Sequence, residues 1–203
     1  MPTVNALVVG LAADGFAVVA DFLPPPVIVA LRAEGERHAL AGEMVPATIG
    51  RGSARVERAD IRGDGICWLD DTATAPSERT FRAAVEGLRL AFNRELALGL
   101  FEFEGHYAFY PPGAAYARHR DRFRDDDARV VSCVMYLNGD WRPADGGALR
   151  LHLGDGRHRD VPPTGGTLVA FRSERFEHEV LPTMGARWSL AGWFRRRAQP
   201  LRH

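Results

Sequence analysis

The sequence after Phe101 is a succession of short β-type runs separated by turn residues. The runs are rich in aromatic and β-branched residues, and glycine, proline, asparagine or aspartate stands between them, as is typical of strands joined by short connections. They read EGHYAFY, AYARHRD, RVVSCVMYLN, GGALRLHL, RHRDVPP, GTLVAF, EHEVLP and ARWSLAGWF. About eight strands in so short a stretch favour a double-sheet jelly roll or a barrel.

The sequence before Phe101 predicts helices that pack against this β core. A short first helix is expected at the N-terminus, residues 15–21 (GFAVVAD) are expected to form a buried strand, and the prolines at 24–26 suit the start of a helix. Another helix is expected to begin at Pro76, and it carries apolar residues at helical spacing: Phe81, Val85, Leu88 and Phe92. We therefore predict an α+β fold, with a double-stranded β-helix (jelly roll) core and N-terminal supporting helices.

Residues 43–65 interrupt this pattern between the two predicted helices. They read EMVPATIGRGSARVERADIRGDG, a polar, arginine-rich stretch that is broken by glycines and shows no sustained hydrophobic period. Its length exceeds what a simple connection needs. We predict a functional loop that acts as a lid over a site, and a plain surface insertion is the alternative.

Length and composition favour one domain over residues 1–203. A chain with 46% hydrophobic residues is long enough for one filled core, and no composition break marks a linker. We divide it into helical support and lid loop (1–100) and jelly-roll core (101–197). A formal net charge of +0 argues against nucleic acid or an anionic membrane as partner. Two distant cysteines and a start without signal-peptide features fit a reducing cytoplasm.

The tripeptide at 119–121 (HRD) predicts two metal ligands from one strand. Residues two apart in a strand point to the same face, so His119 and Asp121 face one cavity while Arg120 points away. His178, in the run EHEVLP, can supply a third ligand from a neighbouring antiparallel strand. Two imidazoles and one carboxylate form the facial triad of non-haem iron(II), which leaves coordination positions open.

Arg187 predicts an anionic cosubstrate beside this metal. It lies nine residues after His178, at the start of the next predicted strand, and Ser189 shares its face. The dicarboxylate 2-oxoglutarate can chelate iron through its 2-oxo acid end while its far carboxylate accepts a bidentate grip from a guanidinium. The Ser189 hydroxyl can add a further donor. The remaining histidines show no partner pattern and are predicted to be surface residues: His38, His106, His152, His158 and His203.

Several motifs together resemble the Fe(II)- and 2-oxoglutarate-dependent prolyl 4-hydroxylases. These include the relatives of the animal enzymes that hydroxylate hypoxia-inducible factor, among them bacterial ones. It runs nearly end to end, through GFAVVADFL, IRGD, YPPGAAYARHRD, VSCVMYLNGDW, GGALRL, HEVLP and RWSLAGW. The segment from Tyr110 to His119 is one residue shorter than the family pattern, and Ser132 stands where the animal enzymes carry threonine.

Carried over by position, the resemblance assigns roles to site residues. It makes His119, Asp121 and His178 the iron ligands, and it places the far carboxylate of 2-oxoglutarate on Arg187 and Tyr136. It implies that the same pocket is lined by Tyr110, Leu149 and Trp193. It also implies that Asp64, in IRGD, pairs with Arg129. Tyr116, by contrast, is expected to be a packing residue.

The resemblance implies hydroxylation at C4 of a prolyl residue in a protein, with release of succinate and CO2. It implies Fe(II), 2-oxoglutarate and O2 as cofactor and cosubstrates, and it allows stimulation by ascorbate. A translation elongation factor is one protein substrate that the bacterial relatives suggest. Two alternatives share the same site residues: an oxygenase acting on a free amino acid or other small molecule, and a slow-turnover oxygen-sensing jelly-roll module.

Overall fold

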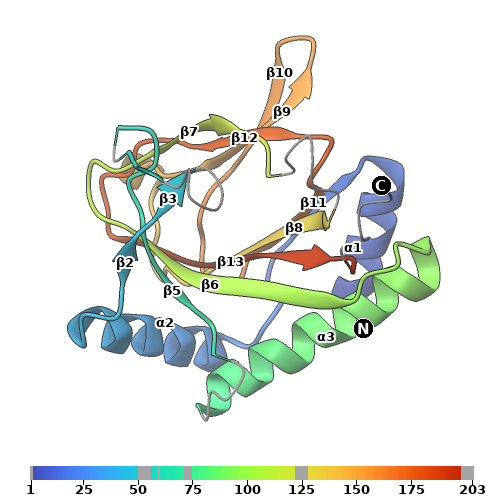
Figure 1. Cartoon of the computed structure of the whole chain (residues 1–203), viewed down its shortest axis with the longest axis horizontal. Coiled ribbons are helices and arrows are strands. Elements are labelled where there is room, and N and C mark those ends of the chain that lie inside the picture. The colour runs from blue at the N-terminus through green and yellow to red at the C-terminus, as the bar shows by residue number, and fades with distance from the viewer. Residues whose placement is uncertain (1, 50–55, 59, 71–74, 122–127, 198–203) are drawn as a thin grey trace, which may run out of the picture.

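A computed structural model of the chain describes residues 2–49, 56–58, 60–70, 75–121 and 128–197 (Figure 1). Its long helices are α1 (Pro2–Ala13), α2 (Pro25–Leu40) and α3 (Pro76–Leu96), and a short 3-10 helix, η2, spans Pro143–Asp145. Proline occupies the first turn of both α2 and α3, where its missing N–H costs no hydrogen bond. No helix within the described ranges is both long and apolar enough to cross a membrane.

Most strands belong to two antiparallel sheets. The seven-stranded sheet has the order β1-β11-β8-β13-β6-β5-β2, and the four-stranded sheet has the order β10-β9-β12-β7. The strands of the larger sheet are β1 (Phe16–Val19), β2 (Val45–Pro46), β5 (Gly65–Trp68), β6 (Glu102–Tyr110), β8 (Arg129–Tyr136), β11 (Leu168–Arg172) and β13 (Arg187–Arg195). Those of the smaller sheet are β7 (Tyr116–His119), β9 (Leu149–Gly154), β10 (Arg157–Val161) and β12 (Glu177–Val180).

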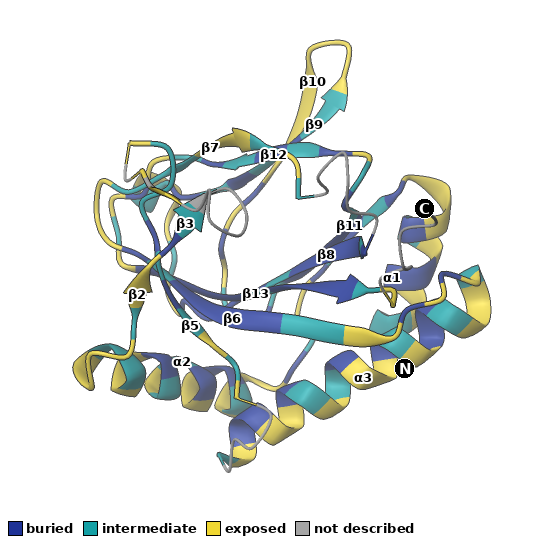
Figure 2. Ribbon diagram, in the orientation of Figure 1, coloured by how far each residue is buried: buried dark blue, intermediate teal, exposed yellow. Residues whose placement is uncertain are grey.

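The two sheets face each other, and the helices cover the outer side of the larger sheet (Figures 1 and 2). One apolar cluster lies between the larger sheet and the helices, and it includes Phe81, Val85, Leu88 and Phe92, as their helical spacing predicts. A second cluster lies between the sheets, with Tyr136, Leu151 and Phe171 among its members. The predicted jelly-roll core with supporting helices is confirmed.

The segment 43–65 contains short strands that its sequence pattern does not reveal. Val45–Pro46 forms β2, which pairs with β5 at the edge of the larger sheet, while β3 (Thr48–Ile49) pairs with β4 (Val56–Glu57) as a separate ribbon. Strands of two residues are too short to show a hydrophobic period, so the sequence reads as a loop. Residues 50–55 and 59 of this predicted lid lie outside the described part of the chain.

Candidate metal and cosubstrate site

Antiparallel pairing of β7 with β12 brings the two predicted histidine ligands together. His178 on β12 lies directly opposite His119 on β7, and their ring centroids are 4.2 Å apart. Asp121 follows the end of β7, with one carboxylate oxygen 3.5 Å from His119 Nε2 and the other 3.5 Å from His178 Nε2. One donor atom from each of the three residues lies within 4.8 Å of the other two. The spacing of two in the sequence and the cross-strand register thus produce one cluster.

The surroundings of Asp121 and His178 favour an ionised carboxylate and a neutral imidazole. The Ser132 hydroxyl donates to Asp121 at 2.6 Å and is itself 2.9 Å from the Ser173 hydroxyl. Burial alone would raise the pKa of Asp121, but the imidazoles of His178 and His119 and the Ser132 hydroxyl lower it well below its usual range. Burial lowers the pKa of His178 to about 4, so its imidazole is neutral near pH 7 and its lone pair is available.

Arg187 is a buried cation near the cluster without a carboxylate partner among the described residues. Only 1% of its surface is exposed, and its Nε donates to the Gly147 carbonyl at 2.8 Å. Its guanidinium carbon lies 4.9 Å from the centre of the Tyr110 ring and 5.2 Å from that of Tyr136. The Tyr136 hydroxyl is buried and has no hydrogen-bond partner among the described residues. A buried guanidinium next to an unsatisfied hydroxyl is the environment that a carboxylate would complete.

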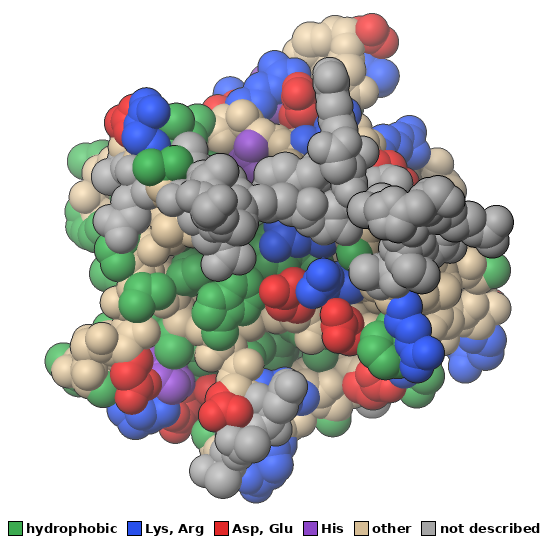
Figure 3. All heavy atoms as spheres, viewed as in Figure 1, with side chains coloured by type: hydrophobic (Ala, Val, Ile, Leu, Met, Phe, Trp, Pro, Cys, Tyr) green, Lys and Arg blue, Asp and Glu red, His purple; other side chains and the backbone are tan. Residues whose placement is uncertain are grey.

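The strand register explains why residues far apart in the sequence share this site. On β13, Arg187 lies opposite Tyr110 of β6, and Ser189 lies opposite Tyr136 of β8. A single cavity of about 790 Å³ is lined by the predicted residues His119, Asp121, His178, Arg187, Tyr110, Leu149, Ser189 and Trp193. Figure 3 shows hydrophobic side chains gathered on this face of the molecule, with acidic and basic side chains beside them.

These observations fit Fe(II) and 2-oxoglutarate. Two imidazoles and a carboxylate on one side of a cavity form the donor set of a non-haem iron site. Donor atoms 3.5 Å apart are close to the roughly 3 Å expected for two ligands at right angles around one ion, each at about 2.1 Å. Arg187 lines the same cavity, and the Tyr136 ring, which is not part of the lining, lies beside the Arg187 guanidinium; together they offer charge and hydrogen bonding to a distal carboxylate.

The predicted pairing of Asp64 with Arg129 is not what the described side chains show. Asp64 is buried, and its two oxygens accept from Arg62 at 2.8 and 3.0 Å. The guanidinium carbon of Arg129 lies 3.5 Å from the centre of the Trp193 ring. Arg62 and Asp64 lie two residues apart on the same short segment before β5, so the Arg62 guanidinium is close enough to pair with the Asp64 carboxylate.

Two further residues touch the site although the sequence did not point to them. The Tyr116 ring, expected only to pack, stacks on the His119 ring with centroids 3.7 Å apart and an interplanar angle of 15°. His106, expected at the surface, is 2% exposed and lines the cavity between Trp68 and Trp193. The motifs assign no role to either side chain, and their positions beside the site become visible only in the folded structure.

The burial of His106 leads us to expect that the free energy of unfolding depends on pH. Burial, followed by the charge of Arg62, lowers its folded-state pKa from 6.5 to about 4, so the unfolded chain binds a proton more readily. Its contribution to stability is therefore complete above pH 6.5 and is lost as the pH falls toward 4. Protonation of His106 should lower the free energy of unfolding by roughly 3 kcal/mol as the pH falls to about 4. We expect His106→Phe to lack this part of the decrease.

Urea denaturation of the metal-free chain between pH 4 and 7 measures this effect. His178 has a folded-state pKa of about 4 and contributes with the same sign, so the His106→Phe variant keeps part of the slope. His158→Gln, at an exposed position, is the matched control and should follow the parent chain. Parallel pH profiles for His106→Phe and the parent would contradict a buried, neutral His106.

The chain is similar to several known proteins. The family described as the 2OG-Fe(II) oxygenase superfamily matches residues 105–195. A Pseudomonas putida prolyl-4-hydroxylase of known structure is 49% identical, with a TM-score of 0.87 over 96% of this chain and 99% of that one. A Trichoplax adhaerens prolyl hydroxylase, solved with a peptide fragment of the hypoxia inducible factor oxygen degradation domain, is 26% identical, with a TM-score of 0.85 over 96% and 89%.

Curated relatives are longer than this chain. Human Egl nine homolog 1 is 33% identical over 144 residues, and the match covers 66% of this chain and 33% of the human protein. Mouse prolyl hydroxylase EGLN3 is 30% identical over 149 residues, and the match covers 70% of this chain and 62% of that protein. The chain therefore spans about a third of the length of the human protein and a little less than two thirds of the length of the mouse protein.

Proposed function

Since this chain belongs to the prolyl 4-hydroxylase family within the 2OG-Fe(II) oxygenase superfamily, we propose that it hydroxylates C4 of a prolyl residue in a protein, with Fe(II) and 2-oxoglutarate, and releases succinate and CO2. The observation that most supports this proposal is the shared cavity. It is lined by a His-Asp-His cluster and by a buried arginine that lacks a carboxylate partner among the described residues.

Each predicted site residue has a proposed role. His119, Asp121 and His178 would hold Fe(II). Arg187 would bind the far carboxylate of 2-oxoglutarate in a bidentate manner, and the Tyr136 hydroxyl would donate to the same group. The remaining predicted residues would line the cosubstrate pocket: Tyr110, Leu149, Ser189 and Trp193.

Bound Fe(II) would supply the oxidising chemistry, using O2 and 2-oxoglutarate, and the chain's own residues would supply position. Ser132 fixes the orientation of the Asp121 carboxylate, and Tyr116 fixes the plane of the His119 ring. The His119 Nδ1 atom is 2.9 Å from the Ala117 carbonyl, so a proton at Nδ1 leaves Nε2 with a lone pair that faces Asp121 and the metal position. Tyr110, Tyr136 and Leu149 are nearly fully buried and exclude water from the arginine end.

A polypeptide is the proposed substrate because of the cavity's size and rim. A cavity of about 790 Å³ exceeds what a small dicarboxylate and a metal ion need. Its outer part is lined by Val45 and Trp68, large apolar side chains that are 52% and 46% exposed. The similar Trichoplax enzyme was solved with a peptide. An extended peptide could place one prolyl side chain toward the metal and lay its flanking residues against this apolar rim.

Residues 43–65 would form a lid as part of one functional unit over residues 1–203. Val45, Pro46, Thr48, Ile61 and Arg62 already line the cavity. We propose that the enzyme works in the cytoplasm and that ascorbate stimulates it as a reductant. We also propose a role in oxygen sensing. A translation elongation factor is the first substrate to test.

Mass spectrometry of a host proteome tests the proposal. We expect cells with the active chain, compared with cells that carry an Asp121→Ala variant, to show a gain of about 16 Da on a prolyl residue of one or a few proteins. A peptide with that sequence should then be hydroxylated by the purified chain, whereas free proline should not. Hydroxylation of free proline alone would favour the small-molecule alternative.

A further inference from the structure

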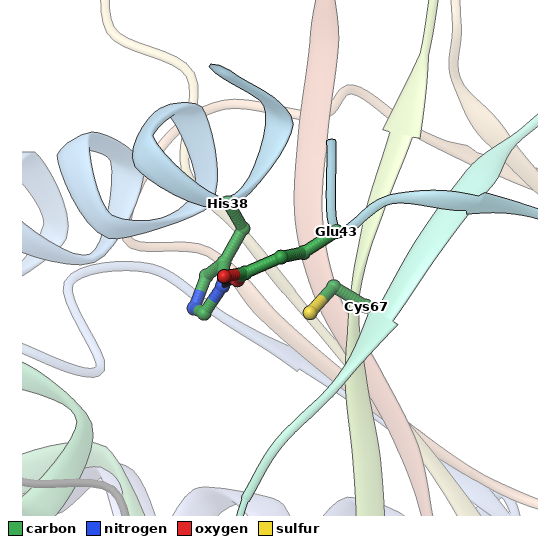
Figure 4. A group of neighbouring side chains, drawn as sticks. All are labelled: His38, Glu43 and Cys67. Atoms are coloured by element: carbon green, nitrogen blue, oxygen red, sulfur yellow. Dashed lines mark hydrogen bonds and ion pairs between the residues drawn. The ribbon is translucent and has the colours of Figure 1, made fainter. Parts of the chain in front are cut away.

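A second cluster of metal-binding side chains lies outside the cavity, where α2 ends beside β5. His38 lies in the last turn of α2, Glu43 in the connection to β2, and Cys67 on β5. One donor atom of each lies within 4.8 Å of the other two. Figure 4 shows the three side chains directed toward one another from these separate elements. None of the three lines the cavity described above.

We propose that His38 Nδ1, a Glu43 carboxylate oxygen and the Cys67 thiolate bind a divalent cation of the zinc class. A mixed set of nitrogen, oxygen and sulfur donors suits this borderline-soft ion, whereas a thiolate disfavours magnesium or calcium. The Glu43 side chain is 49% exposed, so solvent can reach the site and supply a fourth ligand. This proposal is independent of the function proposed for the other site.

The charges around the cluster favour a cation. Glu43 and the buried Glu78 both lie close to His38, and His38 Nδ1 is hydrogen bonded to Glu43. A divalent cation would be attracted to these carboxylates and would stabilise the Cys67 thiolate. Binding would displace a proton from the thiol, so the affinity should increase with pH.

Glu78 has a proposed role as the positioning residue of this site. Its Oε1 atom accepts a hydrogen bond from the Tyr107 hydroxyl at 2.9 Å and lies 3.7 Å from His38 Nε2. When Nδ1 of an imidazole binds a metal, Nε2 carries the proton and needs an acceptor. Arg37 Nη2, now 3.1 Å from His38 Nε2, would give way because its Nε atom pairs with Glu34 and it lies at the surface. Glu78 then completes a carboxylate–histidine–metal arrangement.

The site would connect three elements at the base of the predicted lid. Glu43 is the first residue of the segment 43–65, and Cys67 lies between Ile66 and Trp68, two residues that line the cavity. A bound cation would therefore tie the end of α2 and the start of this segment to β5. The cation would thereby hold the first residues of the segment in place next to the cavity-lining residues of β5.

Cobalt(II) titration of the iron-free full chain tests the proposal, because a thiolate ligand gives Co²⁺ a near-ultraviolet charge-transfer band. We expect the band in the parent chain and in Asp121→Ala, since the site that contains Asp121 uses no thiolate in the proposed ligand set. Cys67→Ser should lose the band, and Cys133→Ser, at the other cysteine, should keep it. Zinc should displace cobalt and abolish the band.

Two carboxylate variants separate binding from positioning. Glu43→Gln, at a half-exposed position that the core does not need, should weaken Co²⁺ binding at least as much as Glu78→Gln. Glu78→Gln should lower the affinity roughly 10- to 100-fold while the band remains, as expected for a residue that only orients a ligand. Glu36→Gln, at an exposed position on α2, the helix that carries His38, is the control. A missing band in the parent chain, or a band that Cys67→Ser does not change, would overturn the proposal.

Discussion

Replacing Asp121 with alanine is expected to abolish hydroxylation and to release iron while the chain remains folded. Among the described residues, Asp121 is the one carboxylate in the cluster with His119 and His178, and each of its oxygens lies 3.5 Å from one histidine Nε2. Two imidazoles without the carboxylate would hold Fe(II) weakly and leave its charge less compensated. The loss should exceed the roughly 10- to 100-fold effect typical of a residue that only supports a metal ligand.

The fold should survive because Asp121 belongs to neither apolar cluster. Its removal leaves Ser132 with the Ser173 hydroxyl as a remaining partner. Iron content, turnover and thermal unfolding should be measured together on one preparation. Asp140→Ala, at an exposed position outside the cavity, is the matched control and should behave like the parent chain. Full activity and full iron content in Asp121→Ala would remove the metal assignment.

Replacing Arg187 with lysine is expected to raise the KM for 2-oxoglutarate roughly 10- to 100-fold while iron binding stays nearly unchanged. Lysine keeps the positive charge but loses the planar pair of donors, and a charged hydrogen bond is worth about 1.5 to 3 kcal/mol. The geometry supports a selective effect, because Arg187 packs against Tyr110 and Tyr136 and is hydrogen bonded to Gly147, so its partners in the described part of the chain include no metal-ligand candidate.

The measurement is succinate formation as a function of 2-oxoglutarate concentration, with iron binding measured in parallel. Arg150→Lys, which alters a partly exposed arginine paired with Asp160 on the smaller sheet, is the matched control. An unchanged dependence on 2-oxoglutarate in Arg187→Lys would mean that another group binds the far carboxylate. A parallel loss of iron binding would point to a structural role instead.

The parts of the site that share one strand could be predicted from the sequence. The spacing of two places His119 and Asp121 on one side of a strand end, and the same period places Arg187 and Ser189 on one face of β13. Short β-type runs likewise predicted the jelly roll. In each case a local rule about strand geometry was sufficient, because the relevant side chains lie within a few residues of one another.

Apart from the place of His178 beside His119, the contacts across strands could not be predicted in this way. His106 lies on β6, where residues 105–108 are all buried because helices cover one face and the cavity lies on the other. Such a strand loses the alternation that would mark an inward residue. Two contacts within a single segment were also missed, the stacking of Tyr116 on His119 and the pairing of Asp64 with Arg62, because they depend on the backbone geometry between the two residues and not on strand alternation. The resemblance in sequence predicted Arg129 as the partner of Asp64, whereas the structure pairs Asp64 with Arg62.

Succinate formation by the purified chain tests the central claim most directly. The assay supplies 2-oxoglutarate and a proline-containing peptide identified from the host proteome, and it omits Fe(II) or O2 in turn. We predict that succinate forms only when Fe(II), O2 and 2-oxoglutarate are all present, and that hydroxyprolyl product appears in about equal amount to the peptide-dependent succinate. No succinate under the complete conditions, or the same amount of succinate with Fe(II) removed by a chelator, would contradict the account.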